Sequence, residues 1–199
     1  MDQLFLVRHG ETLHNVAGIA QGWNDSDLSD KGRRQVQALG ERLAHYAPTA
    51  IYSSPLGRAM STAQAISAAT GVEVQALDDL REMNYGSWEG QSFLDVRRTD
   101  LDLYHRWIAD PDYRCPGGGE SHHDVLRRME RAFAAMDSAR PVVVAHGTAI
   151  RIGATLLLKA PLASFRHLGQ DNAALSVFVR RGERWVLKLW NDTSHCVEP

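Results

Sequence analysis

Near its start the chain carries the run Leu4-Phe5-Leu6-Val7-Arg8-His9-Gly10, in which four apolar residues precede two basic residues and a glycine. Such an apolar run predicts a short buried strand, and the glycine predicts a turn after it. Residues 141–145 repeat the arrangement, since a β-branched run that follows a proline ends at His146 and Gly147. Ligands of open α/β sheets bind beyond the carboxyl ends of the strands, so both His-Gly pairs are candidates for one site.

Strand and helix patterns alternate between these two runs. Ser29 precedes a helical pattern that reaches Leu43, and residues 50–52 form another short apolar run. Ser54 is a suitable N-cap, with Pro55 at the first helical position. Residues 174–179 and 185–190 predict a late hairpin. The alternation predicts an α/β three-layer sandwich, with a mostly parallel central sheet flanked by helices.

Residues 87–139 show a different pattern. Ser92 with Asp95, and Ser121 with Asp124, have the spacing of two helix capping boxes. The first predicted helix carries Leu101, Tyr104 and Ile108 inward, and a glycine-rich loop at 117–119 separates it from the second. We therefore expect one domain over residues 1–199, with residues 87–139 inserted as a small helical lid over the sheet.

Composition restricts the class of partner. The 199 residues include 22 basic and 24 acidic side chains, with a formal net charge of -2. No general field attracts nucleic acid or an anionic membrane, so we expect neither as a partner. Two cysteines, Cys115 and Cys196, are too few for a disulfide framework, which favours a cytoplasmic location. The oligomeric state is open, with a homodimer as one alternative.

Basic side chains are expected to converge at the carboxyl ends of the strands. Arg8, His9 and His146 follow two of the strands, and Arg58 lies in the first turn of the helix that follows a third. Arginine pairs with phosphate oxygens, and helix N-termini favour anions. Neighbouring positive charges disfavour the imidazolium, so a histidine here is expected to be neutral and nucleophilic. The expected ligand is a phosphoryl group.

Ordered sequence blocks across nearly the whole chain resemble the histidine phosphatase superfamily, also called the phosphoglycerate mutase-like family. In chain order the blocks are Leu6-Val7-Arg8-His9-Gly10-Glu11-Thr12 with Asn15, Gln21-Gly22-Trp23 with Asp25, Ser53-Ser54-Pro55-Leu56-Gly57-Arg58-Ala59, Arg81-Glu82 with Gly86, Trp88, Glu89 and Gly90, Gly118-Gly119-Glu120-Ser121, and Val144-Ala145-His146-Gly147. A single Arg-His-Gly would be weak evidence, whereas six blocks in order are specific.

The resemblance implies a metal-independent phosphatase that hydrolyses small phosphomonoesters and needs no cofactor. His9 would become a phosphohistidine, and Glu82 would protonate the leaving oxygen. Arg8, Arg58 and His146 would hold the phosphoryl oxygens. Further phosphate-binding positions implied by the resemblance are Asn15, Gln21, Gly22 and Gly147. Tyr85 and Trp88 are expected to desolvate Glu82 and so keep it protonated.

Other interpretations remain open. The short segment between Glu82 and His146 favours a phosphatase over a phosphoglycerate mutase, which is the main alternative. A non-catalytic phosphate-binding member and a His-ligated metallohydrolase are weaker candidates. Glu89 is a second carboxylate that could be mistaken for the acid. His122 and His123 occupy a predicted helix start, so we expect both at the surface.

Overall fold

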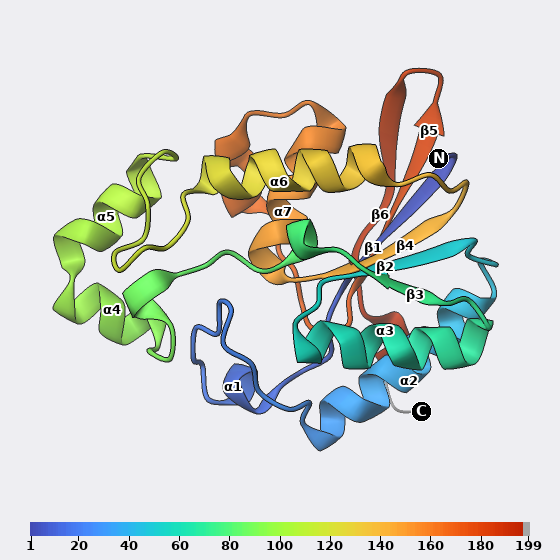
Figure 1. Ribbon diagram of the computed structural model, residues 1–199, viewed down its shortest axis with the longest axis horizontal. Coiled ribbons are helices and arrows are strands. Elements are labelled where there is room, and N and C mark those ends of the chain that lie inside the picture. Colours follow the sequence, from blue (N-terminus) through green and yellow to red (C-terminus); the bar gives the residue numbers. More distant parts are fainter. Residues whose placement is uncertain (197–199) are drawn as a thin grey trace.

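A six-stranded sheet forms the middle layer of the computed structural model, which describes residues 1–196 (Figure 1). Its strands run in the order β3-β2-β4-β1-β5-β6. Their bounds are Gln3–Arg8 (β1), Ala50–Ser53 (β2), Val74–Ala76 (β3), Pro141–Ala145 (β4), Leu175–Arg181 (β5) and Arg184–Asp192 (β6). Strands β1 to β4 are mutually parallel. Strand β5 is antiparallel to both of its neighbours, β1 and β6, and its pairing with β6 forms the predicted late hairpin.

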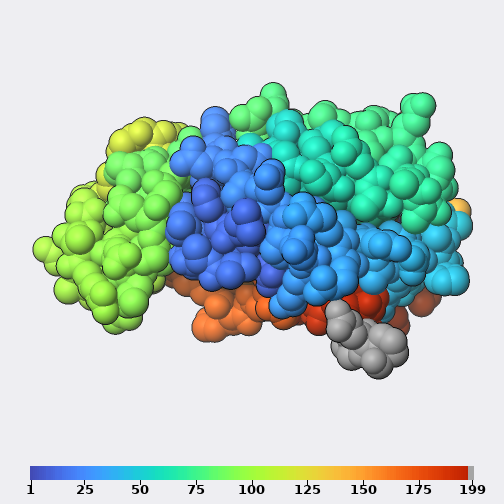
Figure 2. Space-filling view, turned by 90° about the horizontal axis from the view of Figure 1, so that it is seen from below, coloured from blue at the N-terminus to red at the C-terminus, as the bar shows by residue number. Residues whose placement is uncertain are grey.

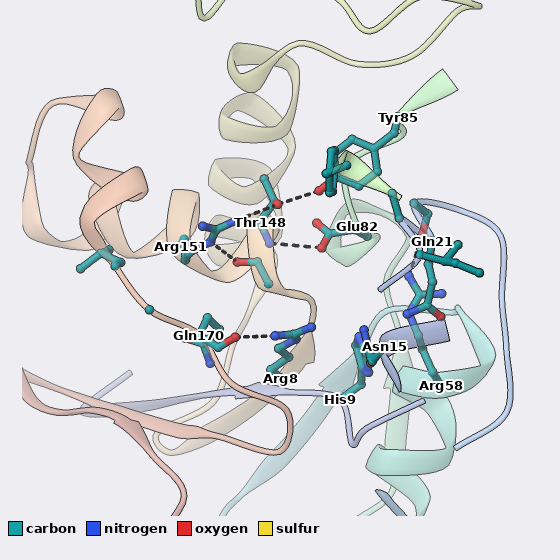
Figure 3. A pocket seen from close by; sticks show the side chains of 17 residues that line it. Arg8, His9, Asn15, Gln21, Arg58, Glu82, Tyr85, Thr148, Arg151 and Gln170 are labelled. Atoms are coloured by element: carbon teal, nitrogen blue, oxygen red, sulfur yellow. Dashed lines mark hydrogen bonds between the residues drawn. The ribbon is translucent and has the colours of Figure 1, made fainter. Parts of the chain in front are cut away.

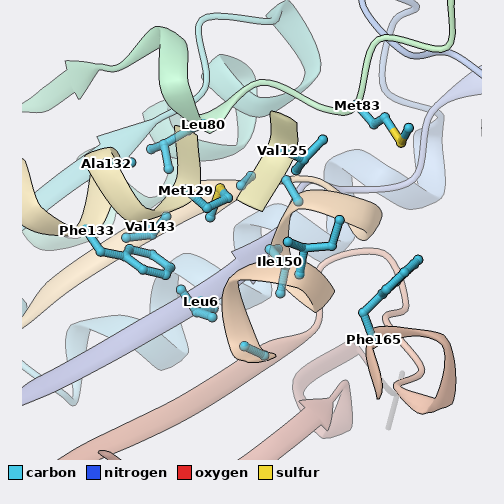
Figure 4. Close-up of a cluster of buried hydrophobic side chains, with 14 of the residues drawn as sticks. Leu6, Leu80, Met83, Val125, Met129, Ala132, Phe133, Val143, Ile150 and Phe165 are labelled. Atoms are coloured by element: carbon cyan, nitrogen blue, oxygen red, sulfur yellow. The ribbon is translucent and has the colours of Figure 1, made fainter. Parts of the chain in front are cut away.

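Helices cover both faces of the sheet and complete the predicted three-layer sandwich. Successive residues of a strand point to opposite faces. Phe5 and Val7 join the core under α2 (Asp30–Ala44) and α3 (Gly57–Thr70). Leu4 and Leu6 join the core under α6 (His122–Ala135) and α7 (Gly147–Leu158). Figure 4 shows this second core, where Leu6 and Val143 of the sheet meet Val125, Met129 and Phe133 of α6 and Ile150 of α7.

The register of two central strands places the two histidines side by side. β1 and β4 are parallel neighbours, with Val7 opposite Val144 and Arg8 opposite Ala145. His9 and His146 are the next residues on each strand and therefore leave the sheet at the same edge. The His9 backbone N–H donates to the Ala145 carbonyl at 3.1 Å, which continues the pairing by one residue.

Most predicted helix starts are confirmed, but one is wrong. Ser29, Ser92 and Ser121 are N-caps whose hydroxyls accept backbone N–H bonds. Ser54 is not an N-cap, because α3 begins only at Gly57 with Leu56 in the cap position. The Ser54 hydroxyl instead lies 2.8 Å from Nε2 of His146.

The segment predicted as the lid contains two kinds of helix. α4 (Phe93–Thr99) and α5 (Leu101–Ala109) stand away from the sheet at one end of the molecule (Figure 1). They are separate helices that meet at Asp100, not one continuous helix. α6 lies against α7 and contributes to the core over the sheet. The assignment of residues 87–139 to a lid insertion stays a prediction.

The N-terminal loop lies beside α4 and α5. In the space-filling view the region of α1 (Leu13–Val16) borders the region of α4 and α5 (Figure 2). Ile19 and Ser92 form an isolated β-bridge between these two regions. Short 3-10 segments complete the described chain: η1 (Asp78–Leu80), η2 (Gly86–Trp88), η3 (Leu162–His167) and η4 (Ser194–Cys196). Among residues 1–196 no helix has the length and apolarity needed to cross a membrane.

Candidate active site

Two buried imidazoles lie at the carboxyl edge of the sheet. The ring centroids of His9 and His146 are 5.2 Å apart, and both side chains are almost completely buried. Nδ1 of His9 lies 2.7 Å from the Gly10 carbonyl oxygen. A carbonyl can only accept, so in the neutral ring Nδ1 carries the proton and Nε2 carries the lone pair.

Burial and neighbouring cations keep both rings neutral. Burial is the largest cause that lowers the pKa of His9 well below its usual value, and the charges of Arg8 and Arg58 lower it further. The pKa of His146 is lowered in the same way, by burial first and then by Arg58. The expectation of neutral histidines next to arginines is consistent with these shifts.

Arg58 is held by oxygen atoms of the loop that precedes α2. Its Nη1 donates to the Asn24 carbonyl at 2.7 Å and to Oδ1 of Asp25 at 3.0 Å, and its Nη2 donates to the Gly22 carbonyl at 2.7 Å. Gly22 has a φ of +54°, and a Cβ there would lie 2.0 Å from Oε1 of Glu89. The close packing of this loop against Glu89 therefore depends on glycine at this position.

Arg8 reaches the same space from the end of β1. One Nη1–H donates to the Gln170 carbonyl, and burial lowers the pKa of the guanidinium. Within the described part of the chain, the buried Nε atoms of Arg8 and Arg58 have no hydrogen-bond partner. A buried donor without a partner is costly, so both atoms are suited to an oxygen of a bound anion.

The Glu82 carboxylate accepts hydrogen bonds from backbone N–H groups. Oε1 accepts from Met83 at 2.8 Å and from Ala149 at 3.2 Å, and Oε2 accepts from Thr148 at 3.1 Å. Thr148 and Ala149 belong to the first turn of α7, where unpaired N–H groups favour negative charge. These contacts fix the orientation of the carboxyl group at the start of α7. Tyr85 does lie close by, with its hydroxyl 2.8 Å from Oγ1 of Thr148.

One cavity of about 290 Å³ collects most of the predicted site residues (Figure 3). Eight of the nine line it: Arg8, His9, Asn15, Gln21, Gly22, Arg58, Glu82 and Gly147. The ninth, His146, is not among the lining residues, although its ring lies next to that of His9. Trp23 contributes indirectly, because its Nε1 donates to the Glu82 carbonyl at 2.8 Å. The predicted residues thus bring an imidazole, two guanidinium groups and a carboxyl group to the cavity.

Nine lining residues were not assigned a phosphate-binding or catalytic role, although Tyr85 was expected next to Glu82. They are Ile19, Ala20, Tyr85, Phe93, Thr148, Arg151, Leu168, Gly169 and Gln170. Arg151 follows Gly147 by four residues, a spacing that places both on one face of a helix and could have identified it. Residues 168–170 follow η3 in an irregular segment, and only the tertiary structure brings them to the cavity.

Glu89 and His122 lie in places that bear on two sequence-based interpretations. Glu89 does not line the cavity; its carboxylate accepts from the backbone N–H groups of Trp23 and Tyr85 at 2.9 and 3.1 Å. His122 was expected at the surface, and this was wrong, since its ring has an exposed fraction of 0% between Trp107 and Phe165. Only His123 of the pair is partly exposed.

Among residues 1–196 no three His, Cys, Asp or Glu side chains are grouped to hold a metal ion.

Comparison with known proteins identifies the family of this chain. The model of the histidine phosphatase superfamily (branch 1) matches residues 4–193. The chain belongs to the histidine phosphatase superfamily. Its relatives in this superfamily include Probable phosphoglycerate mutase GpmB of Erwinia tasmaniensis, which is 34% identical over 98% of this chain and 95% of that protein.

Two other members of the superfamily carry names that denote phosphatases. Phosphoserine phosphatase 1 of Hydrogenobacter thermophilus is 34% identical over 100% of this chain and 96% of its own length. The solved structure of a mycobacterial glucosyl-3-phosphoglycerate phosphatase with VO3 has a TM-score of 0.85 and 34% identity, over 96% of this chain and 99% of that one. These similarities support a hydrolase that acts on phosphate esters.

Proposed function

We propose that this member of the superfamily is a metal-independent phosphatase that hydrolyses small phosphomonoesters in two steps. The observation that carries the proposal is the hydrogen bond from Nδ1 of His9 to the Gly10 carbonyl, which leaves the lone pair on Nε2. That imidazole shares a cavity with Arg8, Arg58 and Glu82. A nucleophile, two phosphate-binding cations and an acid are the groups that such a reaction requires.

In the first step Nε2 of His9 forms a bond to phosphorus while the ester P–O bond breaks. Arg8 and Arg58 balance the charge on the phosphoryl oxygens, and a proton passes from Glu82 to the leaving alcohol. In the second step water attacks phosphorus, the N–P bond breaks, and Glu82 takes a proton from the water. Phosphate leaves, and His9 and Glu82 return to their initial states.

The remaining predicted residues bind the phosphoryl oxygens or position the groups that bind them. Asn15, Gln21, Gly22 and Gly147 line the cavity and are assigned to phosphate binding. His146 lies next to His9 and contacts the Ser54 hydroxyl. Its role is to support His9 and, when a phosphoryl group is bound, to donate to one of its oxygens.

Rapid quench with a ³²P-labelled phosphomonoester tests this function. The expected result is acid-labile, alkali-stable radioactivity on the wild-type protein, its absence in His9→Ala, and full labelling in the control His45→Ala, which alters an exposed histidine. Turnover should be unchanged after dialysis against a chelator. Labelling in His9→Ala, or activity lost on chelation and restored by a metal ion, would contradict the proposal.

Phosphoglycerate mutase activity is the second candidate, because a relative named as a probable phosphoglycerate mutase is 34% identical over nearly the whole chain. The two activities differ in the acceptor of the phosphoryl group, which is water in one case and a hydroxyl group in the other. Incubation of the wild-type protein with 3-phosphoglycerate, followed by ³¹P NMR, separates them. The proposed phosphatase releases inorganic phosphate, whereas a mutase forms 2-phosphoglycerate, with 2,3-bisphosphoglycerate as the primer.

A further inference from the structure

Arg151 is a cation in the cavity for which the two-step hydrolysis has no use. It lines the same cavity as His9 and Glu82. Figure 3 shows Arg151 and Arg58 on opposite sides of Glu82, so Arg151 lies away from the part of the cavity that holds Arg58 and His9. A group bound at Arg151 would therefore belong to the alcohol part of the substrate and not to the phosphoryl group.

Among residues 1–196, the groups that hold the Arg151 side chain are all neutral. Nε donates to the Gly147 carbonyl at 3.0 Å, and Nη2 donates to Oγ1 of Thr148 at 3.1 Å. The guanidinium carbon lies 5.5 Å from the centre of the Phe165 ring. These contacts fix its orientation before any ligand arrives, which reduces the entropy lost on binding.

No carboxylate of the described chain forms an ion pair with Arg151. Glu82 shares the cavity, but its oxygens accept backbone N–H bonds instead. Nη1 of Arg151 donates to no atom of residues 1–196, and Arg151 is close enough to Arg8 to lower its pKa. Arg58, in contrast, is paired with Asp25. Within residues 1–196 neither Arg8 nor Arg151 forms an ion pair with a carboxylate, and both guanidinium groups face one cavity. A single phosphoryl group needs only one of them in addition to Arg58.

We infer that Arg151 binds a carboxylate on the leaving alcohol, so that the preferred substrates are phosphate esters of short hydroxy acids. The planar guanidinium matches a carboxylate and can donate more than one N–H to it. The inference rests on the proposed phosphatase function and adds to it the chemical class of the alcohol. It assigns Arg151 to substrate selection, while His9 and Glu82 act on the phosphoryl group.

Matched substrate pairs test this assignment. 3-Phosphoglycerate and glycerol 3-phosphate differ only in a carboxylate against a hydroxymethyl group, and O-phosphoserine differs from phosphoethanolamine by its carboxylate. For the wild-type protein we expect kcat/KM to be about 10- to 100-fold higher for the carboxylate member of each pair, the effect of one charge-assisted contact.

Arg151→Gln should remove that preference mainly through KM, whereas Arg151→Lys should keep part of it. Arg166→Gln is the matched control, because Arg166 also lies over Phe165, at 5.3 Å, but does not line the cavity. Equal kcat/KM for both members of a pair in the wild-type protein, or equal losses for both in Arg151→Gln, would overturn the role of Arg151 and leave the phosphatase function standing. Absence of hydrolysis of all four esters by the wild-type protein would overturn both.

Discussion

The Glu82 carboxylate lies at the N-terminus of α7, where Oε2 accepts the backbone N–H of Thr148 at 3.1 Å. The start of one helix thereby connects three parts of the cavity. Gly147 lines its wall, Thr148 and Ala149 orient the carboxyl group, and Arg151 follows one turn later. The backbone N–H groups of this first turn therefore hold the Glu82 carboxyl group in place at the cavity.

The acid role of Glu82 predicts a dependence on the leaving group. Glu82→Gln should lower kcat by about 10²- to 10⁴-fold for an alkyl phosphate, because the alkoxide then leaves without a proton. For p-nitrophenyl phosphate the loss should be much smaller, since nitrophenolate needs no proton to leave. Steady-state kinetics with both substrates measure the difference. Glu89→Gln is the control, and its effect should be similar for both esters; equal losses in Glu82→Gln would remove Glu82 from the acid role.

The lowered pKa of His9 predicts activity below the pH range of an ordinary histidine. The neutral ring is the nucleophile, and burial together with Arg8 and Arg58 lowers its pKa. The acid limb of the pH profile of kcat/KM reports the free enzyme. Its apparent pKa should therefore lie below the usual histidine pKa of about 6.5. A pH profile corrected for the ionisation of the substrate, with ¹⁵N NMR of the histidines, tests this. A limb at or above that value would show that His9 is not held neutral.

Burial of His122 predicts a loss of stability in acid. Burial and nearby Arg166 lower its pKa from 6.5 to about 4, so between these values the unfolded chain binds a proton that the folded chain does not. Above pH 6.5 His122 is neutral in both states and does not reduce stability. As the pH falls below 6.5, the proton stabilises the unfolded chain, and the free energy of unfolding is about 2 kcal/mol lower by about pH 5. His122→Phe should retain the ring contacts and reduce this loss.

Urea unfolding at about pH 5 and about pH 7.5 measures the His122 effect. His45→Ala serves as the comparison, because it removes a histidine from the surface. The same acid-induced loss in the wild-type protein and in His122→Phe would mean that His122 does not cause it.

Asp25 predicts a link between stability and phosphate binding. Its Oδ1 accepts from Nη1 of Arg58 at 3.0 Å and from the Arg58 backbone N–H at 3.3 Å, and its Oδ2 accepts from the Gly57 backbone N–H. Leu56 provides no side-chain cap for α3, so Asp25 performs that function from a distant loop. Asp25→Ala should reduce the free energy of unfolding by about 1–2 kcal/mol, the usual cost of a lost cap.

The same variant should raise KM, because the Arg58 guanidinium loses its carboxylate. Asp25→Asn should cost less stability, since its amide oxygen can still accept from the helix. Asp27→Asn, an exposed change in the same loop, should alter neither quantity. If Asp25→Ala unfolds at the wild-type denaturant concentration and binds substrate normally, Asp25 neither caps α3 nor positions Arg58.

Sequence patterns were sufficient for features that depend on neighbours in the chain. The apolar run before Arg8 predicted β1, and serine with an acidic residue three positions later predicted the starts of α4 and α6. Ser54 failed as an N-cap because its hydroxyl contacts His146, far away in sequence, while Asp25 reaches α3 from another loop. His122 failed for the same reason, since Trp107 and Phe165 bury it from two other elements.

The sequence by itself determined the alternation of strands and helices and the set of basic residues at the strand ends, because periodicity and local hydrogen bonding are properties of short segments. The tertiary structure decided which side chains share the cavity. Parallel pairing of β1 with β4 brought His9 beside His146, and the start of α7 brought Glu82 and Arg151 to the same wall. Those contacts depend on strand register and helix packing, which are set by apolar burial across the whole chain.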